Sequence, residues 1–321
     1  MIDIKNKNVI LLISCLVLLF AGLRINDPFN WFNYGYKDAP ALLDNFIPDN
    51  LQKITVYDES KLKLQFSRGN DGWKVSSAAN ENHRANNKLV SDSLKNLSEM
   101  KRFREITSNK EKFAEFQVSK ENFHVELTDN ANNKFDVYLG KSGESFSTTL
   151  VRLAEEEEVF SVKGSLKQDW NKSVDEFRDK KVFRLASANI LSIELQGPES
   201  YSLKKSPNIN TWIISSKKDS PAKKDSVSNI LTQIEELEGS RYEISTPSLK
   251  PYGKIDIVLG ANVQMTAEVF QNAKGTEYYI KSTYNPDLMV IAKFKLDAIF
   301  VKEETIIEKA AAPATPEGST N

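Results

Sequence analysis

The chain has 321 residues with 43 basic and 44 acidic side chains, and its net charge of −1 gives no electrostatic basis for binding nucleic acid. With 40% hydrophobic and 27% charged residues, most of it has the composition of an ordinary soluble globular protein, long enough for two domains. Cys15 is the only cysteine, which excludes a disulfide framework and thiol chemistry in the rest of the chain.

The first predicted element is an apolar segment at residues 9–23 that carries no charge. A helix from Lys5 to Arg24 would span about 30 Å, the thickness of a hydrocarbon core, and its charged ends can reach the interfaces. Lys5 and Lys7 precede the segment and Arg24 alone follows it closely, which favours an N-terminus on the cytoplasmic side. We therefore expect residues 1–25 to be a single transmembrane anchor and residues 26–50 to be a juxtamembrane linker.

Two alternatives for this segment stay open. A cleaved signal peptide has an apolar region of similar length, although no small-x-small cleavage pattern follows the run here. Residues 12–15 resemble a bacterial lipobox that would make Cys15 a lipid attachment site. The apolar run continues beyond Cys15, whereas a lipoprotein cysteine normally ends such a run.

The next elements form one α+β unit. Residues 54–58 and 62–66 alternate between apolar and polar side chains, and a turn at 69–72 leads into a strand that contains Trp73. Apolar residues recur at helical spacing over 89–100. Two hairpins are predicted beyond it, one at 123–128 and 134–139 and the other at 149–153 and 159–162. This order favours an antiparallel sheet with one packed helix.

The same order recurs in the second half of the chain. Trp73 aligns with Trp212, Leu64 aligns with Leu203, and the helix at 85–97 aligns with residues 222–234. We expect both tryptophans to be core residues. The sequence thus predicts an α+β protein with two tandem related units at 51–186 and 187–303, followed by a disordered Ala/Pro-rich tail at 304–321.

A family resemblance follows from these residues: Gly72-Trp73-Lys74-Val75, the helix, the strand ending at Gly140, and the Phe-Arg-Asp-Lys stretch that begins at Phe177. Their order resembles the DUF4340 family, a domain of unknown function in bacterial envelope proteins. The resemblance covers residues 54–183 well and the second unit more weakly. Family members often have Tyr-Gly-Leu after the helix, whereas this chain has Phe116-Gln117-Val118, without the glycine.

The resemblance implies a bacterial inner-membrane protein whose bulk lies on the periplasmic side. It also implies protein partners in a membrane complex, because members are commonly encoded beside ABC transporter and gliding-type auxiliary components. The family has no established catalytic residues, so the resemblance implies none in this chain. The second unit has no Phe-Arg-Asp-Lys sequence of its own, since the chain ends near where it would fall.

Sequence motifs give no further site. Neither His83 nor His124 has partners at zinc-ligand spacing, and no phosphate loop, dinucleotide motif or nucleophile elbow is present. His124 alternates with Phe123 and Val125, so we expect it to face solvent. The acidic run at 155–158 is interpreted as a solvated hairpin turn. We predict no catalytic residue, no metal site and no cofactor.

One cluster is singled out at the junction of the two units: Phe177, Arg178, Asp179 and Lys180. It would form either a bonded corner that sets the angle between the units, which we favour, or a docking surface for a partner. The leading functional hypothesis is a non-enzymatic, membrane-anchored accessory or scaffold protein of an ABC-type transporter complex. The alternatives are an envelope module that binds glycan, lipid or peptide and, remotely, a hydrolase with an unmarked site.

Overall fold

The computed structural model describes residues 11, 13–20, 39–77, 82–102, 104–145, 147–206, 211–216, 219–245 and 248–308. Leu11 and residues 13–20 are helical. Over these described ranges, no helix is long and apolar enough to cross a membrane. The other residues of the expected anchor, residues 26–38 of the expected linker and residues 309–321 of the expected tail lie outside the described residues. The expectation that the tail is disordered from residue 304 is wrong for its first residues, because residues 303–306 form a helix in which Ile306 is buried.

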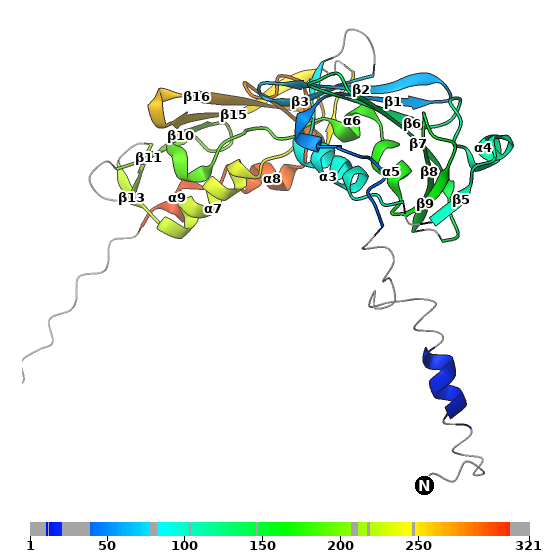
Figure 1. The fold of residues 1–321 in the computed structure, drawn as a ribbon. Helices are drawn as coiled ribbons and strands as arrows, with labels where there is room; N and C mark the ends of the chain where they lie inside the picture. The colour runs from blue at the N-terminus through cyan, green and yellow to red at the C-terminus, as the bar shows by residue number, and fades with distance from the viewer. Residues whose placement is uncertain are drawn as a thin grey trace, which may run out of the picture. The chain divides into compact units, whose positions relative to one another are not determined.

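The chain divides into two compact units, residues 1–178 and 179–321, and each is built around one antiparallel sheet (Figure 1). The strand order is β4-β3-β2-β1-β6-β7-β8-β9-β5 in the first sheet and β13-β12-β11-β10-β15-β16-β17-β18-β14 in the second. The predicted α+β class with two tandem sheet units is therefore confirmed.

In the first unit the strands are β1 (Leu51–Asp58), β2 (Lys61–Gly69), β3 (Gly72–Ser76), β4 (His83–Arg84), β5 (Arg104–Thr107), β6 (His124–Asp129), β7 (Lys134–Ser142), β8 (Thr148–Leu153) and β9 (Val159–Lys163). The helices are η1 (Pro48–Asn50), α3 (Asn87–Ser98), η2 (Lys110–Lys112), α4 (Phe113–Phe116), α5 (Leu166–Trp170) and α6 (Val174–Phe177). Both predicted hairpins are present, as β6–β7 and β8–β9.

In the second unit the strands are β10 (Ile190–Gln196), β11 (Tyr201–Lys205), β12 (Trp212–Ser215), β13 (Ser220–Ala222), β14 (Arg241–Tyr242), β15 (Leu249–Leu259), β16 (Gln264–Asn272), β17 (Tyr278–Ser282) and β18 (Met289–Ile291). The helices are η3 (Ser187–Asn189), α7 (Lys224–Glu235), η4 (Gly260–Asn262), α8 (Lys293–Asp297) and α9 (Glu303–Ile306). Each strand of one sheet has a counterpart at the same position in the other.

Each core lies between the sheet and its longest helix, which covers one face (Figure 1). Val90, Leu94 and Leu97 form the buried stripe of α3, because helical spacing places them on one face. The Asn86 side chain begins this helix by accepting a hydrogen bond of 3.1 Å from the Leu89 amide. Trp73 is buried in this core, as expected, whereas Trp212 is only partly buried and packs against the second core.

Backbone hydrogen bonds show where each repeated unit begins and ends. In the first unit the Leu42 amide donates to the Met100 carbonyl, and in the second the Val182 amide donates to Leu237, each at 2.8 Å. At the other end, the amide just before α3 donates to Phe177, and the amide just before α7 donates to Ile306. Residues 179–183 therefore open the second unit, although the sequence-based boundary lies at residues 186 and 187.

The outer face of the first sheet carries a second, smaller apolar cluster. Val118, Tyr138, Leu150 and Val159 are buried there, with Phe113 and Phe116 from α4 packed against them. Helix α4 ends at Gln117, whose φ of 58° is left-handed. Glutamine therefore occupies, at the end of this helix, the backbone conformation that glycine adopts most easily.

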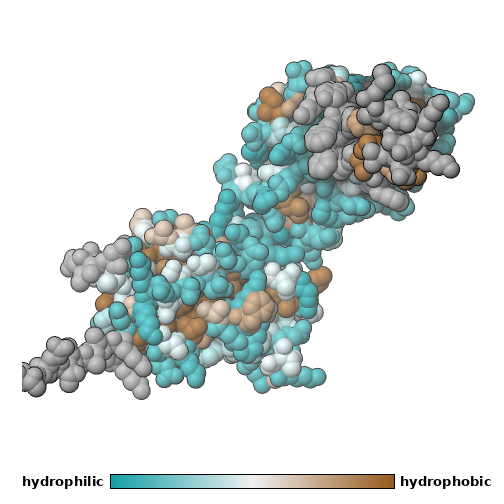
Figure 2. All heavy atoms as spheres, turned by 90° about the horizontal axis from the view of Figure 1, so that it is seen from below, coloured by the Kyte–Doolittle hydropathy of each residue, from teal (hydrophilic) through white to brown (hydrophobic). Residues whose placement is uncertain are grey.

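Seen from below, the visible surface of the units is mainly hydrophilic, with apolar side chains in scattered patches (Figure 2). Single exposed apolar residues are usual on soluble proteins, so these patches by themselves indicate no interface.

Candidate functional site

Phe177 and Arg178 are closing residues of the first unit. Phe177 is fully buried and packs edge-to-face on Phe66, with ring centroids 4.9 Å apart. Arg178 is 9% exposed, pairs with Asp175 at 3.0 Å, and makes an isolated β-bridge with Ala85. These contacts join α6 to the start of α3.

Asp179 and Lys180 belong to the second unit. The Asp179 carboxylate accepts a 2.7 Å hydrogen bond from the Tyr284 hydroxyl, and its carbonyl accepts one of 2.7 Å from the Asn285 side chain. The Lys180 carbonyl accepts from the Gly239 amide at 2.9 Å. The four residues singled out in the sequence are thus consecutive in the chain but are engaged in different units. Whether they also set the angle between the units, or dock a partner, stays a prediction.

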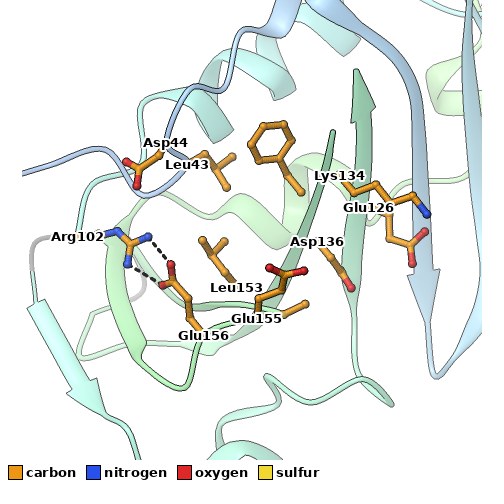
Figure 3. A pocket seen from close by; sticks show the side chains of 11 residues that line it. Leu43, Asp44, Arg102, Glu126, Lys134, Asp136, Leu153, Glu155 and Glu156 are labelled. Atoms are coloured by element: carbon orange, nitrogen blue, oxygen red, sulfur yellow. Dashed lines mark hydrogen bonds and ion pairs between the residues drawn. The ribbon is translucent and has the colours of Figure 1, made fainter. Parts of the chain in front are cut away.

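The first unit has a cavity of about 390 Å³ that is lined by several titratable groups (Figure 3). It opens where the β8–β9 turn leaves the sheet beside the β6–β7 hairpin. Its lining residues are Leu43, Asp44, Arg102, Glu126, Lys134, Phe135, Asp136, Leu153, Ala154, Glu155 and Glu156. Charged side chains thus surround a small apolar floor.

An ion pair closes one side of this cavity (Figure 3). Both terminal nitrogens of Arg102 donate to the Glu156 carboxylate, each at 2.6 Å, and the side chains are only 22% and 28% exposed. Hydrogen bonding to Glu156 raises the pKa of Arg102. The acidic run at 155–158 is therefore not merely a solvated turn, because Glu156 is held in this pair and Glu157 forms an ion pair with Lys110.

Arg152 holds the shape of the turn that borders the cavity. The side chain is 7% exposed, and its guanidinium donates to the carbonyls of Val118, Leu153, Ala154 and Glu156 at 2.8–3.2 Å. It lies 4.5 Å from the centroid of the Tyr138 ring. Burial lowers the pKa of Arg152. Its contacts are with the chain itself, so it is a structural residue of this wall.

Two carboxylates on the opposite side of the cavity, Glu126 and Asp136, lie close to the imidazole of His124, which does not itself line the cavity. His124, Glu126 and Asp136 each offer one atom, and these atoms lie within 4.8 Å of one another. Glu126 and Asp136 are direct cross-strand partners in the β6–β7 hairpin, and His124 lies two residues before Glu126 on the same face. Burial raises the pKa of Asp136; the nearby Glu126 charge raises it too, whereas His124, Tyr138 and Arg152 act to lower it.

The expectation that His124 faces solvent is wrong, since the residue is only 4% exposed. Strand alternation does place it on the face opposite Phe123 and Val125, but that face is covered by further side chains. Its ring stacks on Tyr57, with centroids 4.7 Å apart, and lies 5.2 Å from the Tyr138 ring.

No sequence motif indicates this grouping, because Asp136 lies on β7 whereas His124 and Glu126 lie on β6. The hairpin itself was predicted with its five-residue connection, Asp129 to Asn133. Counting outward from that connection pairs Glu126 with Asp136, so the register of the predicted hairpin indicates that these two carboxylates are neighbours.

Fold and site together define an α+β protein made of two repeated antiparallel sheet units, with a charged cavity in the first. The DUF4340 family model, a domain of unknown function, matches residues 73–254, and the chain belongs to this family. The match begins in β3 and ends in β15, so it includes the junction of the two units. No curated protein and no solved structure matches the chain.

Proposed function

We propose that the protein is a non-enzymatic accessory or scaffold protein, anchored in the bacterial inner membrane and working with an ABC-type transporter complex on the extracytoplasmic side. The observation that carries this proposal is the tandem pair of like sheet units behind an uncharged apolar segment at residues 9–23. Duplicated units offer two similar surfaces to partners, and the segment has the length of a membrane anchor when its charged ends are included.

The cavity supports the non-enzymatic part of the proposal by its composition. Among the described residues that line it, there is no serine, threonine or cysteine. Burial raises the pKa of Asp136, but no side-chain nucleophile of these types lies beside it in the described lining.

A first experiment tests the membrane anchor and the partner together. The full chain, tagged at its C-terminus, is extracted in mild detergent, crosslinked and analysed by mass spectrometry. We expect ABC transporter subunits to copurify. The matched control replaces residues 1–25 with a cleavable signal peptide, which should release the protein to the soluble periplasmic fraction and reduce copurification. Equal recovery of the subunits from the control, or none from either protein, contradicts the proposal.

A second candidate, an envelope module for a small ligand, is favoured by the cavity of about 390 Å³. Its charged rim suits a polar ligand such as a sugar or peptide group better than a lipid tail. Trp73 is buried, so it cannot offer its ring as an aromatic platform for a sugar. Retention of the purified chain on cell-wall fractions without protein partners would favour this candidate over the scaffold.

A further inference from the structure

We propose that His124, Glu126 and Asp136 form a binding site for one divalent transition-metal ion, with Zn²⁺ as the best match. The inference is independent of the scaffold function. It rests on the geometry of the β6–β7 hairpin, on two buried side-chain features at the site, and on a comparison with the same positions in the second unit.

The histidine is already oriented as a ligand. Its Nδ1 lies 2.9 Å from the Asn122 carbonyl oxygen, and because a carbonyl only accepts, Nδ1 carries the proton. The other ring nitrogen, Nε2, then has the lone pair that a metal requires, and histidine ligands are commonly fixed in this way. With 4% exposure and a stacked Tyr57 ring, the imidazole has little freedom to turn away.

The second feature of the site is a buried carboxylate oxygen of Asp136. Its Oδ1 is shielded from solvent and has no hydrogen-bond partner among the described residues. A buried carboxylate oxygen without a donor is costly, so such atoms commonly bind an ion or water. Glu126 supplies the third ligand atom from the partially exposed side, and both carboxylates line the cavity, which gives an ion a path of entry.

The second unit provides a comparison within the same chain. In β10–β15–β16 the register places Lys254, Asp256 and Thr266 at the positions of His124, Glu126 and Asp136. There the Asp256 carboxylate pairs with Lys254 at 2.7 Å and accepts a hydrogen bond from Thr266 at 2.5 Å. The second unit thus pairs its one carboxylate with a cation, whereas the first unit brings two carboxylates and an imidazole together, with only a long hydrogen bond of 3.4 Å from the Tyr57 hydroxyl to Glu126 and one between the Tyr138 hydroxyl and Asp136.

The donor set selects the class of metal. One imidazole and two carboxylates suit Zn²⁺ or a similar first-row ion, whereas Ca²⁺ and Mg²⁺ prefer oxygen ligands throughout. Three protein ligands would leave a fourth tetrahedral position open toward the cavity. Ligand atoms on one Zn²⁺ at about 2.1 Å lie about 3.4 Å apart, so the present spread of up to 4.8 Å has to contract by little more than 1 Å on binding.

Nearby charges set a limit on affinity. Arg152 and Lys134 face this region, and Arg152 acts electrostatically on Asp136. Lys134 is exposed and therefore screened by solvent, so in the immediate site the two carboxylates outweigh the buried guanidinium and favour a dication.

The test uses the full chain in detergent with a tag that lacks histidine. After EDTA treatment and dialysis, Zn²⁺ is added and bound metal is measured by plasma mass spectrometry, with affinity measured by chelator competition. We expect one Zn²⁺ per chain, and a loss of affinity of more than about tenfold in Glu126→Gln, His124→Gln and Asp136→Asn. Asp256→Asn, the matched control in the second unit, should bind as the wild type does.

Glu126 is partially exposed, so E126Q should fold even if a buried variant does not, and circular dichroism checks this. Co²⁺ should give visible absorption bands that disappear in the same variants. Metal binding that is unchanged in E126Q, or no binding at micromolar Zn²⁺, would overturn the proposal.

Discussion

Replacing Phe177 with alanine should unfold the first unit selectively. The ring is fully buried, packs on Phe66 with centroids 4.9 Å apart and stacks near Trp170 at 6.2 Å. Its carbonyl also accepts the 2.7 Å hydrogen bond from the Asn86 amide, at the start of α3. Because the ring sits between two large aromatic side chains that cannot collapse into the space, the loss should be about 3–5 kcal/mol.

Ile306→Ala is the matched variant in the second unit. Ile306 is fully buried and accepts the equivalent hydrogen bond, from the Lys223 amide at 2.8 Å. An isoleucine-to-alanine change in a core typically costs about 2–5 kcal/mol. Hydrogen exchange measured by mass spectrometry distinguishes the two, since each variant should lose amide protection within its own sheet.

The outcome that refutes this reasoning is specific. If F177A loosens amides of β10–β18 as much as those of β1–β9, then Phe177 does not belong to the first unit alone. A loss of stability below about 1 kcal/mol would show that α6 does not close the core in solution.

Three further changes have defined expected results. Gln117→Gly should raise the free energy of unfolding by about 1 kcal/mol, because glutamine occupies a left-handed position at φ 58°. If chemical denaturation shows no such gain, glutamine is not strained at this position. In metal-free protein, burial favours protonated Asp136, so its ionisation destabilises the wild type as pH rises from the ordinary pKa of 3.8 through the raised folded pKa. Asp136→Asn should therefore gain relative stability across that window, and a difference that is constant between pH 4 and pH 8 contradicts this. A double-mutant cycle between Arg102→Ala and Glu156→Ala should give a coupling free energy of about 1 kcal/mol, because the pair is bidentate and only partly exposed. A coupling free energy near zero would mean that water separates the two side chains in solution.

Local pattern predicted most of the fold. Alternation and turn residues identified β1, β2, β3 and both hairpins, and helical spacing identified α3, because each signal lies within a few neighbouring residues. The short strands β4 and β5 have two and four residues and too little periodicity to be recognised. They pair at the two edges of the sheet, where tertiary contacts rather than local preference define them.

The role of the Phe-Arg-Asp-Lys stretch could not be predicted from local pattern, for another physical reason. The Phe-Arg-Asp-Lys stretch was visible as a charged cluster, but the sequence could not show that Phe177 ends one core while Val182 enters the next. The counterpart of Phe177 in the second unit is Ile306, which shares its burial and backbone bond but not its side chain. The prediction that the second unit lacks this element was therefore correct for the motif and wrong for the structure.

The place where one unit ends and the next begins has a consequence for how such chains change. Arg178 makes the last bridge of the first unit, and Asp179 already holds side chains of the second. A genetic crossover at this single peptide bond would exchange, delete or add a complete folding module without cutting either core.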